Sequence, residues 1–166
     1  MNTSKLPFLF AKPEQAPELS QPNNVVVAMG ALASRLALEE RTRTIHPDGR
    51  RENVAEHAFM LTKVSLALAE TLYPWMDRGK IAEYAINHDD VEAYVGDTPT
   101  DVIAQHNPID KQALEHAGLQ QLVSEYESVS PAYTKAVAEY EQQQDYEAQF
   151  VRIVDKMMVL LIHIPN

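Results

Sequence analysis

Residues 85–100 read AINHDDVEAYVGDTPT, and they contain the most informative group of candidate ligands in the chain. His88 and Asp89 are adjacent near the end of an apolar-faced helix, and Glu92 lies about one helical turn after His88. An imidazole beside carboxylates suits Mn, Fe, Co, Ni or Zn without any sulfur ligand. A solvated helix end is the ordinary alternative, so the pair needs partners from elsewhere in the chain.

Two residues outside this stretch are candidate partners. His57 lies on the apolar stripe of the preceding expected helix, where a hydrogen-bonded core histidine is the common alternative. Asp155 interrupts the apolar segment FVRIVDKMMVLLIHI at 150–164. A buried carboxylate is costly unless it is paired or binds a metal. An ion pair with Arg152, or exposure on a narrow polar strip beside Lys156, would also explain this aspartate.

The surrounding patterns predict an all-α fold, a single helical bundle of about six helices. Asn53 followed by Glu56 forms a capping-box pattern, and proline occupies the first helical position of two later helices. The expected helices cover about 24–40, 53–73, 78–94, 107–128, 131–144 and 145–164. The basic segment 41–53 contains a Pro-Asp-Gly turn signal and is predicted to be a loop, with no strand pair.

Length and composition narrow the possible classes of protein. The 166 residues suit one domain, expected over 23–166, and the proline-containing residues 1–22 are expected to form an extended arm. The absence of cysteine excludes disulfides, thiol nucleophiles and thiolate zinc sites. A net charge of −10 argues against binding to a nucleic-acid polymer. No apolar stretch reaches the roughly 20 residues of a membrane span, so a cytoplasmic protein is expected, or one in the host cytoplasm if phage-encoded.

The order His57, His88-Asp89, Asp155 resembles that of the HD-domain metal-dependent phosphohydrolases. The sequence is most similar to the YfbR-type 5′-deoxynucleotidases and their phage relatives, over about 24–160. Four segments carry the resemblance: ENVAEH at 52–57, NHDDVE at 87–92, GDTPT at 96–100 and VDK at 154–156.

This resemblance implies a set of functional residues. It implies that one divalent ion of the Co, Mn, Fe, Ni or Zn type is bound by four residues: His57, His88, Asp89 and Asp155. It also implies that Glu92 orients the attacking water or takes its proton. Asp97 matches a further functional carboxylate, facing the sugar or the leaving oxygen. Outside the family, the alternatives are a surface acid for Glu92 and an ordinary turn residue for Asp97.

The resemblance further implies an arginine at the phosphate, from the loop before the first metal histidine. Arg43 is the best match, and Arg41 is the alternative two residues away. In the family a tryptophan that favours deoxyribose follows this arginine, whereas Thr44 stands here. His46 is a candidate substrate contact. Lys156 is expected to neutralise a neighbouring carboxylate or to reach the phosphate.

These features together predict hydrolysis of a deoxynucleoside 5′-monophosphate to nucleoside and phosphate. The alternatives are a dNTP triphosphohydrolase of the phage dATP type, an alarmone hydrolase, and a non-catalytic nucleotide-sensing module. The expected partners are a small deoxynucleotide and further copies of the same chain, as a dimer or larger homo-oligomer. Neither a nucleic-acid polymer nor a membrane is expected as a partner.

Overall fold

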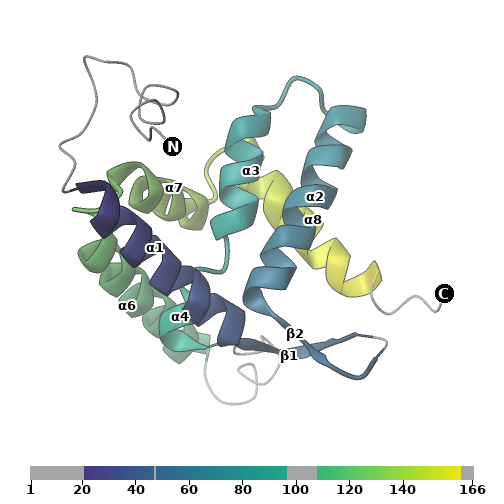
Figure 1. Ribbon diagram of the computed structural model, residues 1–166. Coiled ribbons are helices and arrows are strands. Elements are labelled where there is room, and N and C mark those ends of the chain that lie inside the picture. The colour runs from purple at the N-terminus through teal and green to yellow at the C-terminus, as the bar shows by residue number, and fades with distance from the viewer. Residues whose placement is uncertain (1–20, 47, 97–107, 162–166) are drawn as a thin grey trace, which may run out of the picture.

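The computed structural model describes residues 21–46, 48–96 and 108–161 (Figure 1). In this part of the chain the helices are α1 (Gln21–Leu38), α2 (Val54–Leu72), α3 (Arg78–Asn87), α4 (Glu92–Val95), α6 (Pro108–Tyr126), α7 (Pro131–Gln142) and α8 (Tyr146–Leu161). The two described strands are β1 (Glu40–Ile45) and β2 (Arg51–Asn53). All the helices except α4 have ten or more residues, so the prediction of an all-α bundle of about six helices is confirmed.

Local capping signals mark several of the helix ends. The Asn53 Oδ1 accepts from the Glu56 backbone N at 2.9 Å, and the Glu56 Oε2 accepts from the Asn53 backbone N at 3.1 Å, which completes the expected capping box of α2. Pro131 is the first residue of α7, as expected. Asp145 caps α8, because its Oδ1 accepts from the Ala148 backbone N at 2.8 Å.

The segment predicted as a loop before α2 is a β-hairpin, so the prediction of no strand pair is wrong. β1 and β2 are antiparallel, with Glu40 opposite Asn53 and Ile45 opposite Arg51, and the register is irregular between these pairs. Gly49 provides the positive φ of 84° that the expected turn requires. The hairpin lacks an apolar alternation because polar side chains face the candidate site, so the usual strand signal is missing.

The helix predicted over 78–94 is interrupted at residues 88–91, here called the HD turn. Backbone bonds through the turn join residues three apart, as from the Glu92 N to the Asp89 O at 2.9 Å. Side chains of three successive residues, His88, Asp89 and Asp90, contact α3, β1 and α7 respectively. Because these three contacts point to different elements, they account for the interruption of the helix. Neither apolar spacing nor capping signals in the sequence predict it.

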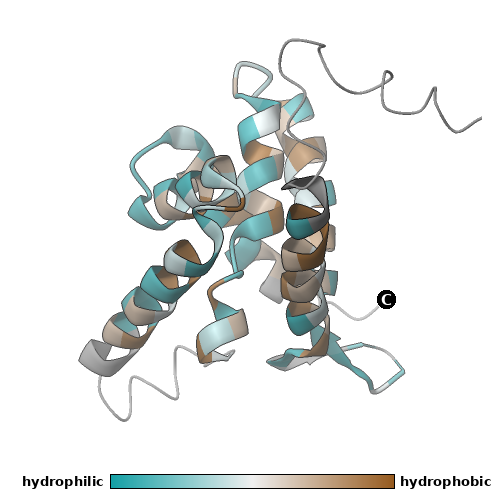
Figure 2. Ribbon diagram, turned by 60° about the vertical axis from the view of Figure 1, so that its left-hand side comes forward, coloured by the Kyte–Doolittle hydropathy of each residue, from teal (hydrophilic) through white to brown (hydrophobic). Residues whose placement is uncertain are grey.

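Two hydrophobic cores support the HD turn on either side. The helices carry both hydrophobic and hydrophilic residues, as is expected of amphipathic helices that pack around a core (Figure 2). The first core joins α2, α3, α7 and α8 through residues that include Leu61, Ile81, Tyr84 and Val151. The second core joins α1, α6 and α7 through residues that include Leu32, Leu122, Tyr126 and Val137. Since Ala85 belongs to the first core and Val91 to the second, the HD turn connects the two.

Parts of the expected domain organisation lie outside the described residues. Residues 1–20 of the expected arm are among them, and residues 21–22 belong to α1, which begins at Gln21 rather than near Asn24. Over the described ranges, none of the helices combines the length and apolarity that crossing a membrane would require.

Candidate metal centre

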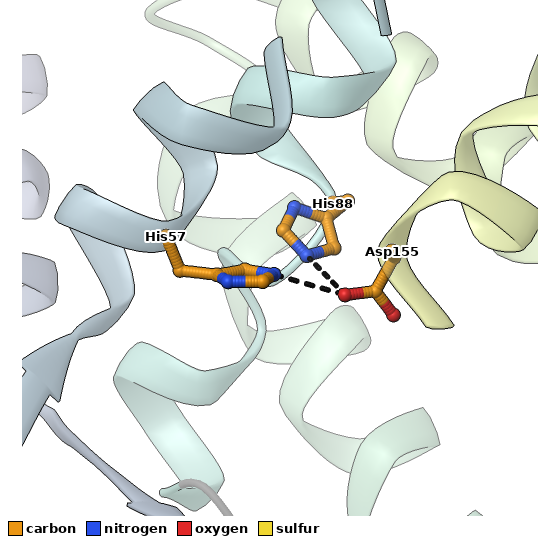
Figure 3. Close-up of side chains that lie close together, drawn as sticks. All are labelled: His57, His88 and Asp155. Carbon is orange, nitrogen blue, oxygen red and sulfur yellow. Dashed lines mark hydrogen bonds and ion pairs between the residues drawn. The ribbon is translucent and has the colours of Figure 1, made fainter. Parts of the chain in front are cut away.

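Three side chains, from α2, the HD turn and α8, converge on one point (Figure 3). His57 lies in the first turn of α2, His88 follows the last residue of α3, and Asp155 lies on α8. One ligand atom from each lies within 4.8 Å of the other two. The His57 Nε2 is 2.9 Å and the His88 Nε2 is 3.9 Å from the Asp155 Oδ1. Both histidines are buried, whereas 26% of the Asp155 side chain is exposed, so the group opens to solvent at Asp155.

The orientation of His88 tests whether this group fits a metal ion. Its Nδ1 lies 3.0 Å from the Ala85 carbonyl oxygen. Because a carbonyl can only accept, Nδ1 carries a proton, and Nε2 of the neutral ring is an acceptor. That Nε2 lies 2.8 Å from the Asp89 Oδ2, so two acceptor atoms face each other. A proton or a metal cation between them removes the conflict, and two imidazoles with carboxylates suit a divalent transition metal.

Asp89 lies beside the group of three rather than within it. Its Oδ2 contacts the His88 Nε2 and also accepts from the Arg41 Nη1 at 2.6 Å. Burial alone would raise the pKa of Asp89, but His88 and Arg41 outweigh it and hold that pKa well below its ordinary range. Asp89 is therefore a carboxylate at neutral pH, placed between an imidazole and a guanidinium.

Arg41, one of the two candidate phosphate-binding arginines, lies beside the group of three, where it contacts Asp89. Burial disfavours its charged form, yet nearby carboxylates, those of Asp89, Glu92 and Asp155, outweigh burial and raise the pKa of Arg41. Arg43 and Thr44 follow on β1, but their side chains lie outside the described part of the structure. Arg41 is thus a positive charge beside the converging ligands, and the expected phosphate role of Arg43 stays a prediction.

The remaining candidate residues differ in their surroundings. Glu92 is the first residue of α4, directly after the HD turn, and its Oε2 is buried. The His46 Nε2 lies 3.5 Å from the Glu56 Oε2, at the start of α2. Lys156 has an exposed side chain. Asp97 falls outside the described residues, so its expected role stays a prediction.

The structure also shows two buried acids that the sequence patterns did not single out. Glu52 on β2 has no exposed surface, although it occupied a segment expected to be a polar loop. Asp90 is buried in the HD turn and accepts from the Tyr133 hydroxyl at 2.7 Å. Burial raises the pKa of Asp90 to about 7. Both acids lie within segments that carry the family resemblance, 52–57 and 87–92, but their burial was not predicted because it depends on distant elements.

The contacts of Asp155 decide between the explanations left open for this residue. Its Oδ1 pairs with His57 across 98 positions of the sequence, and the Arg152 side chain is exposed. The carboxylate therefore belongs to the buried histidine group rather than to a polar strip on α8.

Comparisons with known proteins agree with this geometry. The chain belongs to the HD domain family, because a family model described as an HD domain matches residues 33–166. A solved structure of a predicted metal-dependent phosphohydrolase from Magnetospirillum magnetotacticum MS-1 is similar, with 26% identity, a TM-score of 0.71, and coverage of 88% of this chain and 72% of that one.

Two archaeal structures are also similar to the chain. A conserved hypothetical protein from Pyrococcus furiosus is 25% identical, with a TM-score of 0.59 and coverage of 84% of this chain and 85% of that one. The PH0347 protein from Pyrococcus horikoshii OT3 is 26% identical, with a TM-score of 0.60 and coverage of 85% and 82%. A search of curated proteins finds no match.

Proposed function

We propose that this protein is a metal-dependent phosphohydrolase that releases phosphate from deoxynucleoside 5′-monophosphates. The observation that carries the proposal is the convergence of His57, His88 and Asp155, with Asp89 beside them and acceptor atoms facing one another. Membership of the HD domain family and the similarity to a predicted metal-dependent phosphohydrolase support the same class of reaction. The deoxynucleotide substrate rests on the sequence resemblance to the 5′-deoxynucleotidases.

The proposed ligands of the divalent ion are His57, His88, Asp89 and Asp155. A bound ion would polarise a phosphoryl oxygen and lower the pKa of a water molecule, which are the two contributions this chemistry needs. Because Asp155 is the partly exposed member of the group, a phosphate group would approach the ion from its side. Both histidines are held by packing, since their rings lie 5.3 Å apart and His88 also packs edge-on against Tyr140.

Arg41 is the proposed phosphate-binding cation. Its Nη1 already donates to a carboxylate oxygen of Asp89, and a guanidinium has further donors to offer. A phosphate at the group of three would bring its own negative charge close to this cation. Arg41 would then offset the charge that develops on the phosphoryl oxygens during hydrolysis.

Glu92 is the proposed general base. It follows the HD turn and begins α4, so its backbone is tied to the same segment as His88 and Asp89. In this role its carboxylate takes a proton from the attacking water. Asp97, which lies outside the described residues, keeps the predicted role toward the sugar or the leaving oxygen.

A product assay tests the proposal directly. Purified protein loaded with Co²⁺ or Mn²⁺ is incubated with dAMP, AMP, dATP and ATP at equal concentration, and the released product is identified. Phosphate from dAMP in preference to AMP is the expected result, and chelator-treated protein is the control. Triphosphate released from dATP, with dAMP inert, would instead indicate a triphosphohydrolase. Nucleotide binding without turnover on any substrate would indicate a sensing module.

We also infer that the protein forms a homo-oligomer. Val26 and Val27 are adjacent apolar residues on α1, and their side chains are 72% and 71% exposed. Burial of these residues against another copy would remove them from water. Sedimentation velocity tests the inference: the wild type should sediment as a dimer or larger species, and the double substitution Val26→Asp, Val27→Asp should shift it toward the monomer. A monomeric wild type would refute it.

A further inference from the structure

Glu52 is a buried carboxylate without an evident structural purpose. It is the central residue of β2, directly before Asn53, which caps α2, and none of its surface is exposed. Neither of its carboxylate oxygens has a hydrogen-bond partner among the described residues. Burying an ionised carboxylate is costly, so a position like this calls for nearby donors.

Two nitrogen atoms approach the same oxygen of Glu52. The His57 Nδ1 is 3.4 Å from the Glu52 Oε2, and the Arg41 Nε is 3.6 Å from it. Both separations slightly exceed an ordinary N–H···O hydrogen bond, so a small movement of the side chains would close either one. The carboxylate is therefore shared between a candidate metal ligand and the candidate phosphate-binding cation.

His88 shows what such an acceptor does for a metal-binding histidine. The Ala85 carbonyl oxygen lies 3.0 Å from the His88 Nδ1, which keeps the proton there and leaves Nε2 as the ligand atom. His57 presents its Nε2 to Asp155 in the same way, but no backbone carbonyl is found at its Nδ1 among the described residues. Glu52 occupies the corresponding place, with a charged acceptor instead of a neutral one.

We propose that Glu52 is a positioning residue that accepts the Nδ1 proton of His57, presents Nε2 to the metal, and holds Arg41 in place through its Nε. The inference rests on the proposed function, because it concerns the metal ligands of the same site. A carboxylate behind a ligating histidine orients the ring and raises its basicity, and loss of such a partner typically lowers metal affinity about 10- to 100-fold.

A simpler role for Glu52 would be that of counter-ion to Arg41 alone. In that role the carboxylate would affect the arginine and the stability of the hairpin, but not the affinity of His57 for a metal. The shorter contact, 3.4 Å against 3.6 Å, is the one to His57, which lies in the first turn of α2, five positions after Glu52 on β2. The two roles therefore differ in an observable quantity, the metal affinity.

The test is calorimetric titration of metal-free protein with Zn²⁺, together with NMR of the histidine rings in the zinc-loaded protein. Glu52→Gln keeps the shape of the side chain and removes its charge. We expect it to weaken Zn²⁺ binding about 10- to 100-fold and to shift the His57 Nδ1–H resonance upfield. Glu56→Gln, four residues further along, is the matched control, because Glu56 caps α2 and pairs with Arg50 at 2.8 Å. It should leave Zn²⁺ affinity unchanged.

The outcomes separate this inference from the proposed function. Wild-type Zn²⁺ affinity and an unshifted Nδ1–H signal in Glu52→Gln would overturn the inference and leave the metal site standing. No Zn²⁺ binding by the wild type would instead refute the proposed function. If Glu52→Gln does not fold, Arg41→Met provides the second measurement. It removes the other partner of Glu52, so an intact His57 Nδ1–H signal in zinc-loaded protein supports the inference, and its loss overturns it.

Discussion

Helices α3 and α8 pack against each other (Figure 1), and similar residues are used in opposite ways near the two ends of α3. At one end, Asp145 accepts hydrogen bonds from the Ala148 N at 2.8 Å and the Tyr84 hydroxyl at 2.9 Å, and pairs with the Lys80 Nζ at 2.8 Å. At the other end, Asp155 faces two buried histidine nitrogens. We call these the anchor end and the metal end.

The two ends differ in the source of the positive charge that balances their carboxylates. At the anchor end the described contacts of the Asp145 carboxylate are all with donors of the same chain. The network therefore stabilises the fold without a bound ion. At the metal end the His88 Nε2 lies 2.8 Å from the Asp89 Oδ2, and a proton or a metal cation between the two atoms would balance the carboxylate. The group at the metal end could therefore hold a divalent ion, whereas the contacts at the anchor end are made within the chain.

The sharpest test of this contrast is Asp155→Ala at the metal end. We expect the bound metal and nearly all phosphatase activity to disappear, because the variant removes the ligand that joins the two histidines. Elemental analysis of the purified protein and phosphate release measure the two effects. Ile153→Ala, at a residue 58% exposed on the same helix, is the control and should keep both. Full activity of wild-type protein in excess chelator would contradict the assignment.

A second test separates the proposed base from the metal ligands. Glu92→Gln should retain metal close to the wild-type amount while kcat falls about 10²- to 10⁴-fold, the usual contribution of a positioned acid or base. Metal content and steady-state kinetics on dAMP are measured together. A variant that loses metal and recovers turnover when metal is resupplied would make Glu92 a metal ligand instead.

A third test concerns the cation that belongs to the metal end. Arg41→Ala should lower kcat/KM about 10- to 100-fold, since hydrogen bonds to a charged group are worth about 1.5–3 kcal/mol. Arg51→Ala should have little effect, because Arg51 is exposed and its Nη1 donates to the Thr42 carbonyl oxygen at 2.9 Å. Arg43→Ala completes the comparison of kcat/KM values. A larger loss for Arg43→Ala than for Arg41→Ala would return the phosphate role to Arg43.

The smallest effect is expected at the anchor end. Asp145→Ala should cost about 0.5–2 kcal/mol of stability, as for a lost helix N-cap, and leave metal affinity intact. Burial opposes the charge of Asp145, but Lys80 and the Ala148 N–H outweigh it and lower its pKa below the ordinary value of 3.8. The stabilisation is therefore fully present above about pH 4 and lost as the pH falls below that value.

Thermal unfolding of wild type and Asp145→Ala between pH 2 and pH 7 measures this contribution. The difference in melting temperature should be constant above about pH 4 and shrink in more acidic solution. A difference that grows on acidification would contradict the sign of the shift. Loss of metal in Asp145→Ala would show that the two ends are not independent.

The helical architecture follows from signals that act over a few residues. The capping box at Asn53, the proline at 131 and the cap at Asp145 predict the starts of three helices, and the structure confirms them. The same local rules miss the hairpin and the break at the HD turn. Strand pairing joins residues such as Glu40 and Asn53, and the break depends on side chains held by three separate elements.

The sequence by itself determined the amphipathic helices and the order of the candidate ligands, because apolar spacing and caps depend on neighbours along the chain. Only the tertiary structure decided which polar residues meet. Arg41 contacts Asp89 across 48 positions, and His57 contacts Asp155 across 98. Glu52 on the hairpin is fully buried and lies 3.4 Å from the His57 Nδ1. Burial and charge pairing depend on such distant contacts, so they emerge only when the helices and the hairpin pack together.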